Sequence, residues 1–197
     1  MYDQYLHAYE KLSLSTAGII MGLVLLVLHG WALAKPEATK AALNSVSTNE
    51  KAARTLLTID FVWLFLLLLD TEWNPLCMNL FDFNRTRGYL LILCPIVWFV
   101  LYSRGKDLLF PRALGFFLLL LAIVPLTAAF LKDPVTRLLI PCWCYPVLTV
   151  AMFWVGKPYL FRDWMSKYTA CPRLYTISNA IGATWGAAIL ICAVCFW

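Results

Sequence analysis

Two ionisable side chains, His29 and Asp60, occur inside long apolar stretches of this sequence. An ionisable group at membrane depth is costly to bury, so each is a functional candidate by default. His29 lies about five residues before the end of its stretch, and Asp60 about six residues after the start of the next one. Because consecutive helices run in opposite directions and rise about 1.5 Å per residue, the two side chains should lie at similar depth.

We therefore predict a contact between His29 and Asp60 near one end of two neighbouring helices. The favoured interpretation is a hydrogen bond that holds these helices together. The first alternative is a pair that binds a proton or a ligand, in which Asp60 fixes the tautomer of the imidazole. The second alternative is that the two side chains do not meet.

Aromatic side chains between two prolines form a second candidate site, at Trp143 and Tyr145. Proline removes a backbone donor and kinks a helix, and such breaks are tolerated where neighbours or a cavity satisfy the freed carbonyl. Kinks at one level of three helices would open an outward-facing pocket that these two side chains line. Ordinary kinks without a pocket are the favoured alternative. The prolines concerned are Pro95, Pro125, Pro141 and Pro146.

Cysteines form a third group of candidates for a disulfide or for thiol chemistry: Cys77, Cys142, Cys144, Cys192 and Cys195. In an oxidising outer compartment, a disulfide of Cys77 with Cys192 or Cys195 is one option. The simpler interpretation is that cysteine serves here as a small hydrophobic residue. Because no histidine accompanies these thiols, we predict no metal site and no cofactor.

Small residues repeat on two of the apolar stretches. In lipid no hydrophobic effect drives helices together, so they associate through close packing. Small side chains permit this packing because they let the helix backbones approach closely. We predict that these positions pack helices within the chain, with contact to another subunit as the alternative. They are Gly18, Gly22 and Gly30 on the first stretch and Ser178, Gly182 and Gly186 on the last.

The elements that carry these residues are predicted to be membrane-spanning helices. The 197 residues are 62% hydrophobic and 14% charged, whereas soluble domains are about 45–50% apolar and about 25% charged. Lipid must therefore solvate much of the chain. We predict a single all-α, multi-pass membrane domain with about six spans, near 17–34, 54–71, 88–103, 111–131, 137–156 and 174–197.

Charge sets the predicted orientation of these spans. The connections after the first, third and fifth spans carry eleven Lys and Arg residues, and the remaining segments outside the spans carry five. Since cytoplasmic loops are enriched in Lys and Arg, both termini are predicted to lie outside. The segments 35–54 and 157–173 combine cations with Ala-rich or aromatic sequence, so we predict short interfacial helices there. The outer segment 73–83 is predicted to dip into the opposite interface.

The favoured function is a non-catalytic subunit or scaffold of a membrane assembly, because the sequence shows no catalytic motif and has short loops. Its partners would be the lipid bilayer and either further copies or other membrane subunits; scattered basic residues argue against nucleic acid. One alternative is an oligomeric transporter or channel for a small solute or proton that uses His29 and Asp60. The other is a membrane thiol oxidoreductase that uses the outer cysteines. A bacterial inner membrane is the predicted location.

Overall fold

The computed structural model describes residues 9, 12–69, 74, 85–104 and 108–197. Within these ranges the chain forms helices and no strand, which confirms the all-α class. Four segments contain helix long and apolar enough to cross a membrane: α1 (Leu14–Ala34), α5 (Leu109–Ala129), α6 (Leu139–Gly156) with the short 3-10 helix before it (Val135–Leu138), and α8 (Pro172–Cys195).

Two further helices correspond to the other predicted spans but are less clearly membrane-spanning. α3 (Glu50–Leu68) carries Glu50, Lys51 and Arg54 in its first turns. α4 (Arg87–Arg104) contains a shorter apolar stretch, Arg87–Ser103. By length and composition alone, therefore, four of the six predicted spans qualify.

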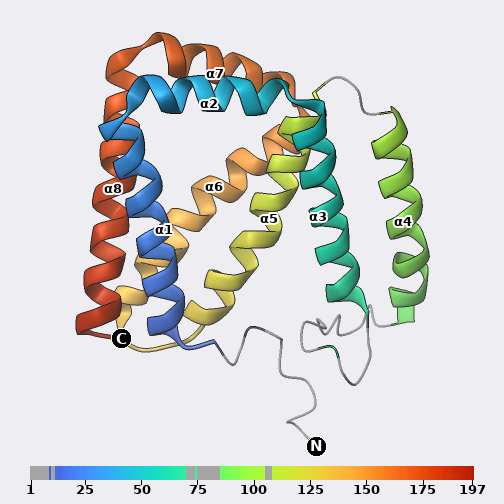
Figure 1. Cartoon of the computed structure of the whole chain (residues 1–197). Helices are drawn as coiled ribbons and strands as arrows, with labels where there is room; N and C mark the ends of the chain where they lie inside the picture. Colours follow the sequence, from blue (N-terminus) through green and yellow to red (C-terminus); the bar gives the residue numbers. More distant parts are fainter. Residues whose placement is uncertain (1–8, 10–11, 70–73, 75–84, 105–107) are drawn as a thin grey trace, which may run out of the picture.

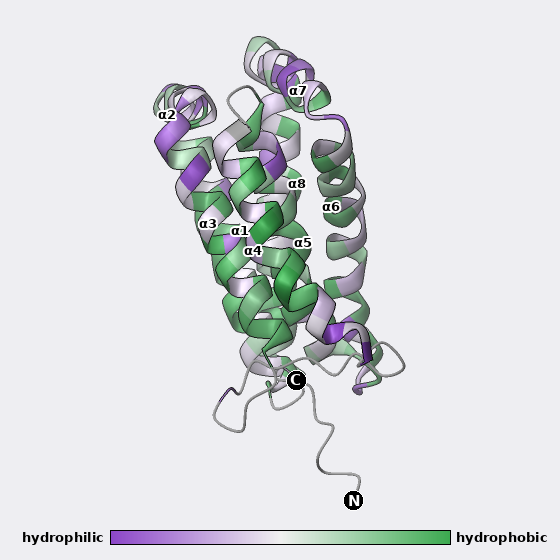
Figure 2. Ribbon diagram, turned by 90° about the vertical axis from the view of Figure 1, so that its right-hand side faces the viewer, coloured by the Kyte–Doolittle hydropathy of each residue, from purple (hydrophilic) through white to green (hydrophobic). Residues whose placement is uncertain are grey.

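The segments predicted to be interfacial contain α2 (Pro36–Thr48) and α7 (Tyr159–Ala170). Both lie across the same end of the bundle, roughly perpendicular to the long helices (Figure 1). Figure 2 views them almost along their axes and shows polar residues concentrated there, above strongly hydrophobic α3, α4, α5 and α6. The predicted dip of 73–83 falls outside the described residues, apart from Asn74.

The helix boundaries follow from local chemistry. The side chain of Ser13 accepts a hydrogen bond from the backbone N–H of Thr16 and so caps α1, and Asn49 accepts from Lys51 and Ala52 at the start of α3. Such caps satisfy backbone donors that the first turn leaves free. Pro36 and Pro172 occupy the first turns of α2 and α8, where the missing N–H of proline costs nothing.

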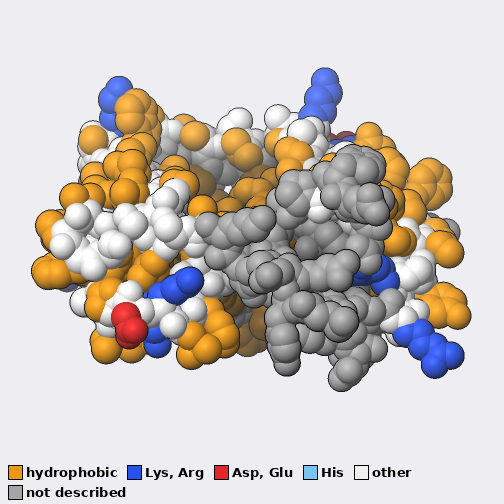
Figure 3. All heavy atoms as spheres, turned by 90° about the horizontal axis from the view of Figure 1, so that it is seen from below, with side chains coloured by type: hydrophobic (Ala, Val, Ile, Leu, Met, Phe, Trp, Pro, Cys, Tyr) orange, Lys and Arg blue, Asp and Glu red, His pale blue; other side chains and the backbone are white. Residues whose placement is uncertain are grey.

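The long helices group into two pairs on either side of a crossing centre. α1 packs along α8 on one side, α3 along α4 on the other, and α5 and α6 cross between them (Figure 1). Among the described residues seen from the end opposite α2 and α7, hydrophobic side chains predominate, with a few Lys, Arg and acidic side chains between and beside them (Figure 3). Large hydrophobic side chains are also exposed along the sides of the long helices, such as Leu28 on α1, Phe99 on α4 and Phe153 on α6, as expected of a bundle whose solvent is lipid.

Candidate functional site

Small residues bring α1 and α8 into backbone contact. A Cβ added at Gly22 would lie 2.9 Å from the backbone nitrogen of Leu190, and one at Gly186 would lie 2.9 Å from that of Leu26. A Cβ at Gly182 would overlap the ring of His29. A Cβ added at Gly18 would overlap the ring of Trp197. A Cβ added at Gly30 would meet no atom of another element within 4 Å, so Gly30 takes no part in the contact. Ser178 bonds only within its own helix, to the carbonyl of Tyr175.

The close approach of α1 and α8 creates a buried polar network around Asn179. Its Nδ2 donates to the hydroxyl of Tyr168 (2.7 Å) and to the backbone carbonyl of Tyr175 (2.8 Å). A carbonyl can only accept, so the orientation of the amide is fixed. The Oδ1 of Asn179 must then accept from Nδ1 of His29, 3.0 Å away.

This donor assignment defines the tautomer of His29. A neutral imidazole that donates from Nδ1 carries its lone pair on Nε2. Nε2 makes no hydrogen bond with the described residues. The ring stands edge-on to Trp143, with 6.0 Å between centroids, and Trp143 lies beside Trp185. Of the two residues predicted to line an outward-facing pocket, Trp143 thus packs beside His29, whereas Tyr145 is 61% exposed on α6.

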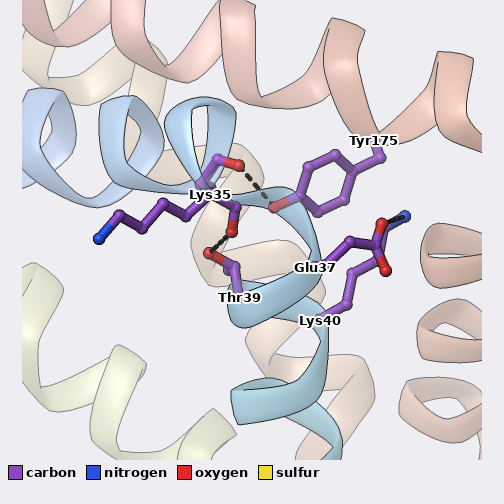
Figure 4. A network of polar contacts seen from close by, with 6 residues as sticks. Lys35, Glu37, Thr39, Lys40 and Tyr175 are labelled. Carbon is purple, nitrogen blue, oxygen red and sulfur yellow. Dashed lines mark hydrogen bonds and ion pairs between the residues drawn. The ribbon is translucent and has the colours of Figure 1, made fainter.

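Tyr175 ties the same region to α2 (Figure 4). Its hydroxyl donates to the carbonyl of Ala32 at 2.9 Å, and the ammonium of Lys40 lies 5.1 Å from the centre of its ring. Lys40 also pairs with Glu37 at 3.2 Å. The end of α1, the start of α8 and the first turns of α2 are thus held at one junction.

Aromatic contacts extend the network from Tyr168 along α7 to α6. Tyr168 stacks on Trp164, with 4.7 Å between ring centroids, and Trp164 lies 5.5 Å from Trp154 of α6. Trp154 meets Phe161 of α7 edge-on at 4.9 Å. Aromatic pairs in these geometries contribute about 0.5–1.5 kcal/mol each beyond their buried area. Together these contacts hold α7 on the bundle.

The predicted contact between His29 and Asp60 is wrong. His29 bonds to Asn179, and neither carboxyl oxygen of Asp60 has a hydrogen-bond partner among the described residues. The reason is lateral separation. α2, which joins α1 to α3, lies flat and its 13 residues span about 20 Å. α5 packs against both α1 and α3 and lies between them, so equal depth does not produce contact.

Asp60 is instead an isolated carboxyl in the face of α3 that packs on α5. Its side chain is completely buried. Neighbouring Phe61 and Trp63 meet Phe116 and Phe117 of α5, with centroid distances of 5.6 and 6.1 Å. An unpartnered carboxylate in such surroundings is very costly, so the neutral acid is the favoured form.

We expect Asp60→Leu to raise the thermal stability of the detergent-solubilised protein. Leucine removes two buried oxygens that lack partners among the described residues, and a buried polar group left unsatisfied costs about 1–3 kcal/mol. Thermal unfolding followed by size-exclusion chromatography measures the change. Asp163→Leu on exposed α7 is the control and should have little effect. A lower melting temperature for Asp60→Leu would mean that the carboxyl holds a bound ion or water.

The predicted disulfide or thiol residues form no disulfide in the part of the chain that the structure describes. Cys142, Cys144, Cys192 and Cys195 are free thiols, and Cys77 lies outside the described residues. Cys144 is buried beside Leu14, Ala129 and Ile140. Sequence reasoning missed that Cys192 and Cys195 form a C-x-x-C spacing, a signal of thiol chemistry. They lie at the C-terminus of α8, however, where the helix dipole disfavours a thiolate.

Sequence reasoning also missed the network of Asn179, Tyr168 and Tyr175. The partner of His29 was sought only among ionisable residues within the spans, which excludes asparagine. An asparagine inside an apolar helix was the available signal, since an unpaired amide there is costly. Among the described residues, no group of His, Cys, Asp and Glu could hold a metal ion.

No family model, curated protein or solved structure matches this chain. Inference about its function therefore rests on the residues themselves. Those residues give two separate polar features, the Asn179 network between α1 and α8 and the isolated Asp60 between α3 and α5.

Proposed function

We propose that this chain is a six-span membrane protein with both termini outside, acting as a non-catalytic subunit that assembles with partner subunits or with itself. Support for the orientation comes from α2 and α7, which carry Lys and Arg residues and lie at the same end of the bundle. Positive segments favour the cytoplasmic side. α1 begins and α8 ends at the opposite end, which requires an even number of crossings (Figure 1).

The observation that carries the assembly role is the one-sided packing of α4. Among the residues of α4 whose exposure is described, 87–103, only Arg87 and Cys94 are buried. The helix packs chiefly on α3, through Trp98, which donates to Thr58 at 3.3 Å, and through Cys94. Its outward face carries large side chains that are each more than half exposed: Tyr89, Ile92, Ile96 and Phe99.

A helix held on one side only is suited to pack against another helix on the other. In lipid, helices associate through close van der Waals packing rather than a hydrophobic effect. The spacing of these four residues, at intervals of three and four, forms a continuous row like the core positions of a coiled coil. We place the subunit contact on this row. Apart from Gly30, the Gly positions predicted for packing make contacts inside the chain, between α1 and the C-terminal segment that contains α8.

We expect the double variant Ile92→Ala, Phe99→Ala to lower the association constant of the assembly roughly tenfold, which corresponds to about 1.4 kcal/mol. Solubilisation from native membranes in a mild detergent, then size analysis and mass spectrometry, measures the assembly. The matched control is Val27→Ala, Leu28→Ala on α1, two side chains of equal exposure. A stable monomer with no bound partner in the wild type would refute the assembly role, and equal loss in the control would refute the α4 contact.

A second candidate is proton or small-solute transport, favoured by one observation. Asp60 is completely buried and neither of its oxygens is hydrogen-bonded, while Nε2 of His29 also lacks a partner among the described residues. Ionisable groups in this condition mark proton and ion paths in other membrane proteins. Transport by the purified protein in liposomes tests this role, and transport that survives both Asp60→Asn and His29→Ala would exclude these residues from it.

A further inference from the structure

A groove with a cationic end runs along α3, and Trp63 and Tyr9 are among its lining residues. Its volume is about 920 Å³. Lys51 and Arg54 line one end, Ile59, Val62 and Leu66 line the length, and Tyr102 of α4 forms part of a side. We propose that this groove binds an anionic phospholipid, with the phosphate at Lys51 and Arg54 and an acyl chain along α3.

The cationic end has unused capacity for an anion. Lys51 forms no ion pair with the described residues, and Nε of Arg54 is buried without a hydrogen-bond partner among them. The guanidinium of Arg54 lies 5.2 Å from the ring centre of Tyr102, which holds it at the groove. Glu50 lies 3.6 Å from Arg54 and neutralises part of the charge. One net positive charge remains, together with donors that suit a phosphate oxygen.

The remainder of the groove is mainly apolar, with Thr55 and Thr58 also in its lining, and is long enough for a lipid chain. Lys51 and Leu66 are fifteen positions apart on one helix, a distance of about 22 Å. One leaflet of hydrocarbon is about half of a 30 Å core. Ile59 and Val62 are about half exposed along this length. A soluble phosphate compound would use only the cationic end, so the combination fits a lipid.

The proposed orientation strengthens the choice of an anionic lipid. The start of α3 joins α2 at the end of the bundle assigned to the cytoplasm (Figure 1). Anionic lipids in that leaflet attract Lys and Arg by about 1 kcal/mol per residue. This step rests on the orientation given under Proposed function, whereas the binding itself depends only on the groove.

Native mass spectrometry of the purified protein, with dioleoyl phosphatidylglycerol or dioleoyl phosphatidylcholine added, tests the proposal. We expect binding of phosphatidylglycerol to exceed that of phosphatidylcholine, and the double variant Lys51→Gln, Arg54→Gln to abolish the difference. Each cation should account for about fivefold in affinity. Glu50→Gln should increase phosphatidylglycerol binding, an opposite change at the same end of the groove.

Further variants separate binding in this groove from a general attraction of anionic lipid to positive charge. The control Lys157→Gln, Arg162→Gln removes two cations near α7, at the same end of the bundle, and should leave the preference intact. Val62→Trp fills the apolar length and should weaken both lipids. Equal binding of the two lipids, equal loss in the control, or displacement by glycerol 3-phosphate would overturn the proposal. Circular dichroism and elution volume verify that each variant is folded. Loss of subunit assembly with lipid binding intact would contradict the assembly role given under Proposed function and would leave the lipid site standing.

Discussion

Gly186→Leu is expected to prevent stable packing of α1 against α8 and to unfold the bundle in mild detergent. A Cβ at this position would lie 2.8 Å from Cβ of Leu25 and 2.9 Å from the backbone nitrogen of Leu26. Backbone cannot move aside as a flexible side chain can, so the helices must separate. Overpacking by a few methylenes already costs about 1–3 kcal/mol, and a leucine here displaces the whole interface.

The measurement is the melting temperature and the fraction of monodisperse protein after solubilisation. Gly186→Ala should give a smaller loss in the same direction, which keeps the comparison quantitative if the leucine variant cannot be purified. Gly30→Leu is the matched control, because a Cβ there meets nothing within 4 Å. Wild-type stability of Gly186→Leu would contradict the α1–α8 contact.

Asn179→Leu is expected to have the second largest effect, a loss of more than about 3 kcal/mol in the free energy of unfolding. The substitution leaves Nδ1 of His29 and the hydroxyl of Tyr168 without the partner that Asn179 provides, whereas the carbonyl of Tyr175 keeps its hydrogen bond from Ser178. Each buried polar group left unsatisfied costs about 1–3 kcal/mol. Thermal unfolding in detergent, monitored by tryptophan fluorescence, reports the loss.

A double-mutant cycle distinguishes this network from a general effect of leucine. Asn179→Leu combined with His29→Leu should destabilise by less than the sum of the two single changes, because the first already removes the partner of His29. Thr184→Leu is the control on the same helix, since the hydroxyl of Thr184 bonds only to the backbone of α8. Strict additivity of the two single effects would show that His29 and Asn179 do not interact.

The helices themselves could be predicted from sequence because each has a local cause. Apolar stretches of the right length, the cap at Ser13 and prolines in first turns at Pro36 and Pro172 are all readable along the chain. The two helices that lie across one end of the bundle were predicted from their mixture of cations with alanine or aromatic residues. Local composition also explains why α3, with charges in its first turns, does not qualify as a span on hydropathy alone.

The candidate site could be predicted only in part because depth is a local property and lateral position is not. The number of residues from a helix end gives the depth of His29 and Asp60, but nothing in either stretch states which helices are neighbours. α1 pairs with α8, some 150 residues away, because Gly22 and Gly186 permit contact. Asn179 is then the partner of His29, and Asp60 is left without a hydrogen-bond partner among the described residues.

The flat helix α2 has a consequence for how this chain can change in length. Only Lys35 separates α1 from α2, and only Asn49 separates α2 from α3. Each residue advances a helix by about 100° of rotation. One residue inserted into α2 would therefore turn the exit direction of α3 by about a quarter turn around the axis of α2, from into the bundle to along the membrane plane. Insertions into α2 should therefore preserve the packing of α3 on the bundle only when they add close to whole helical turns, about 3.6 residues each.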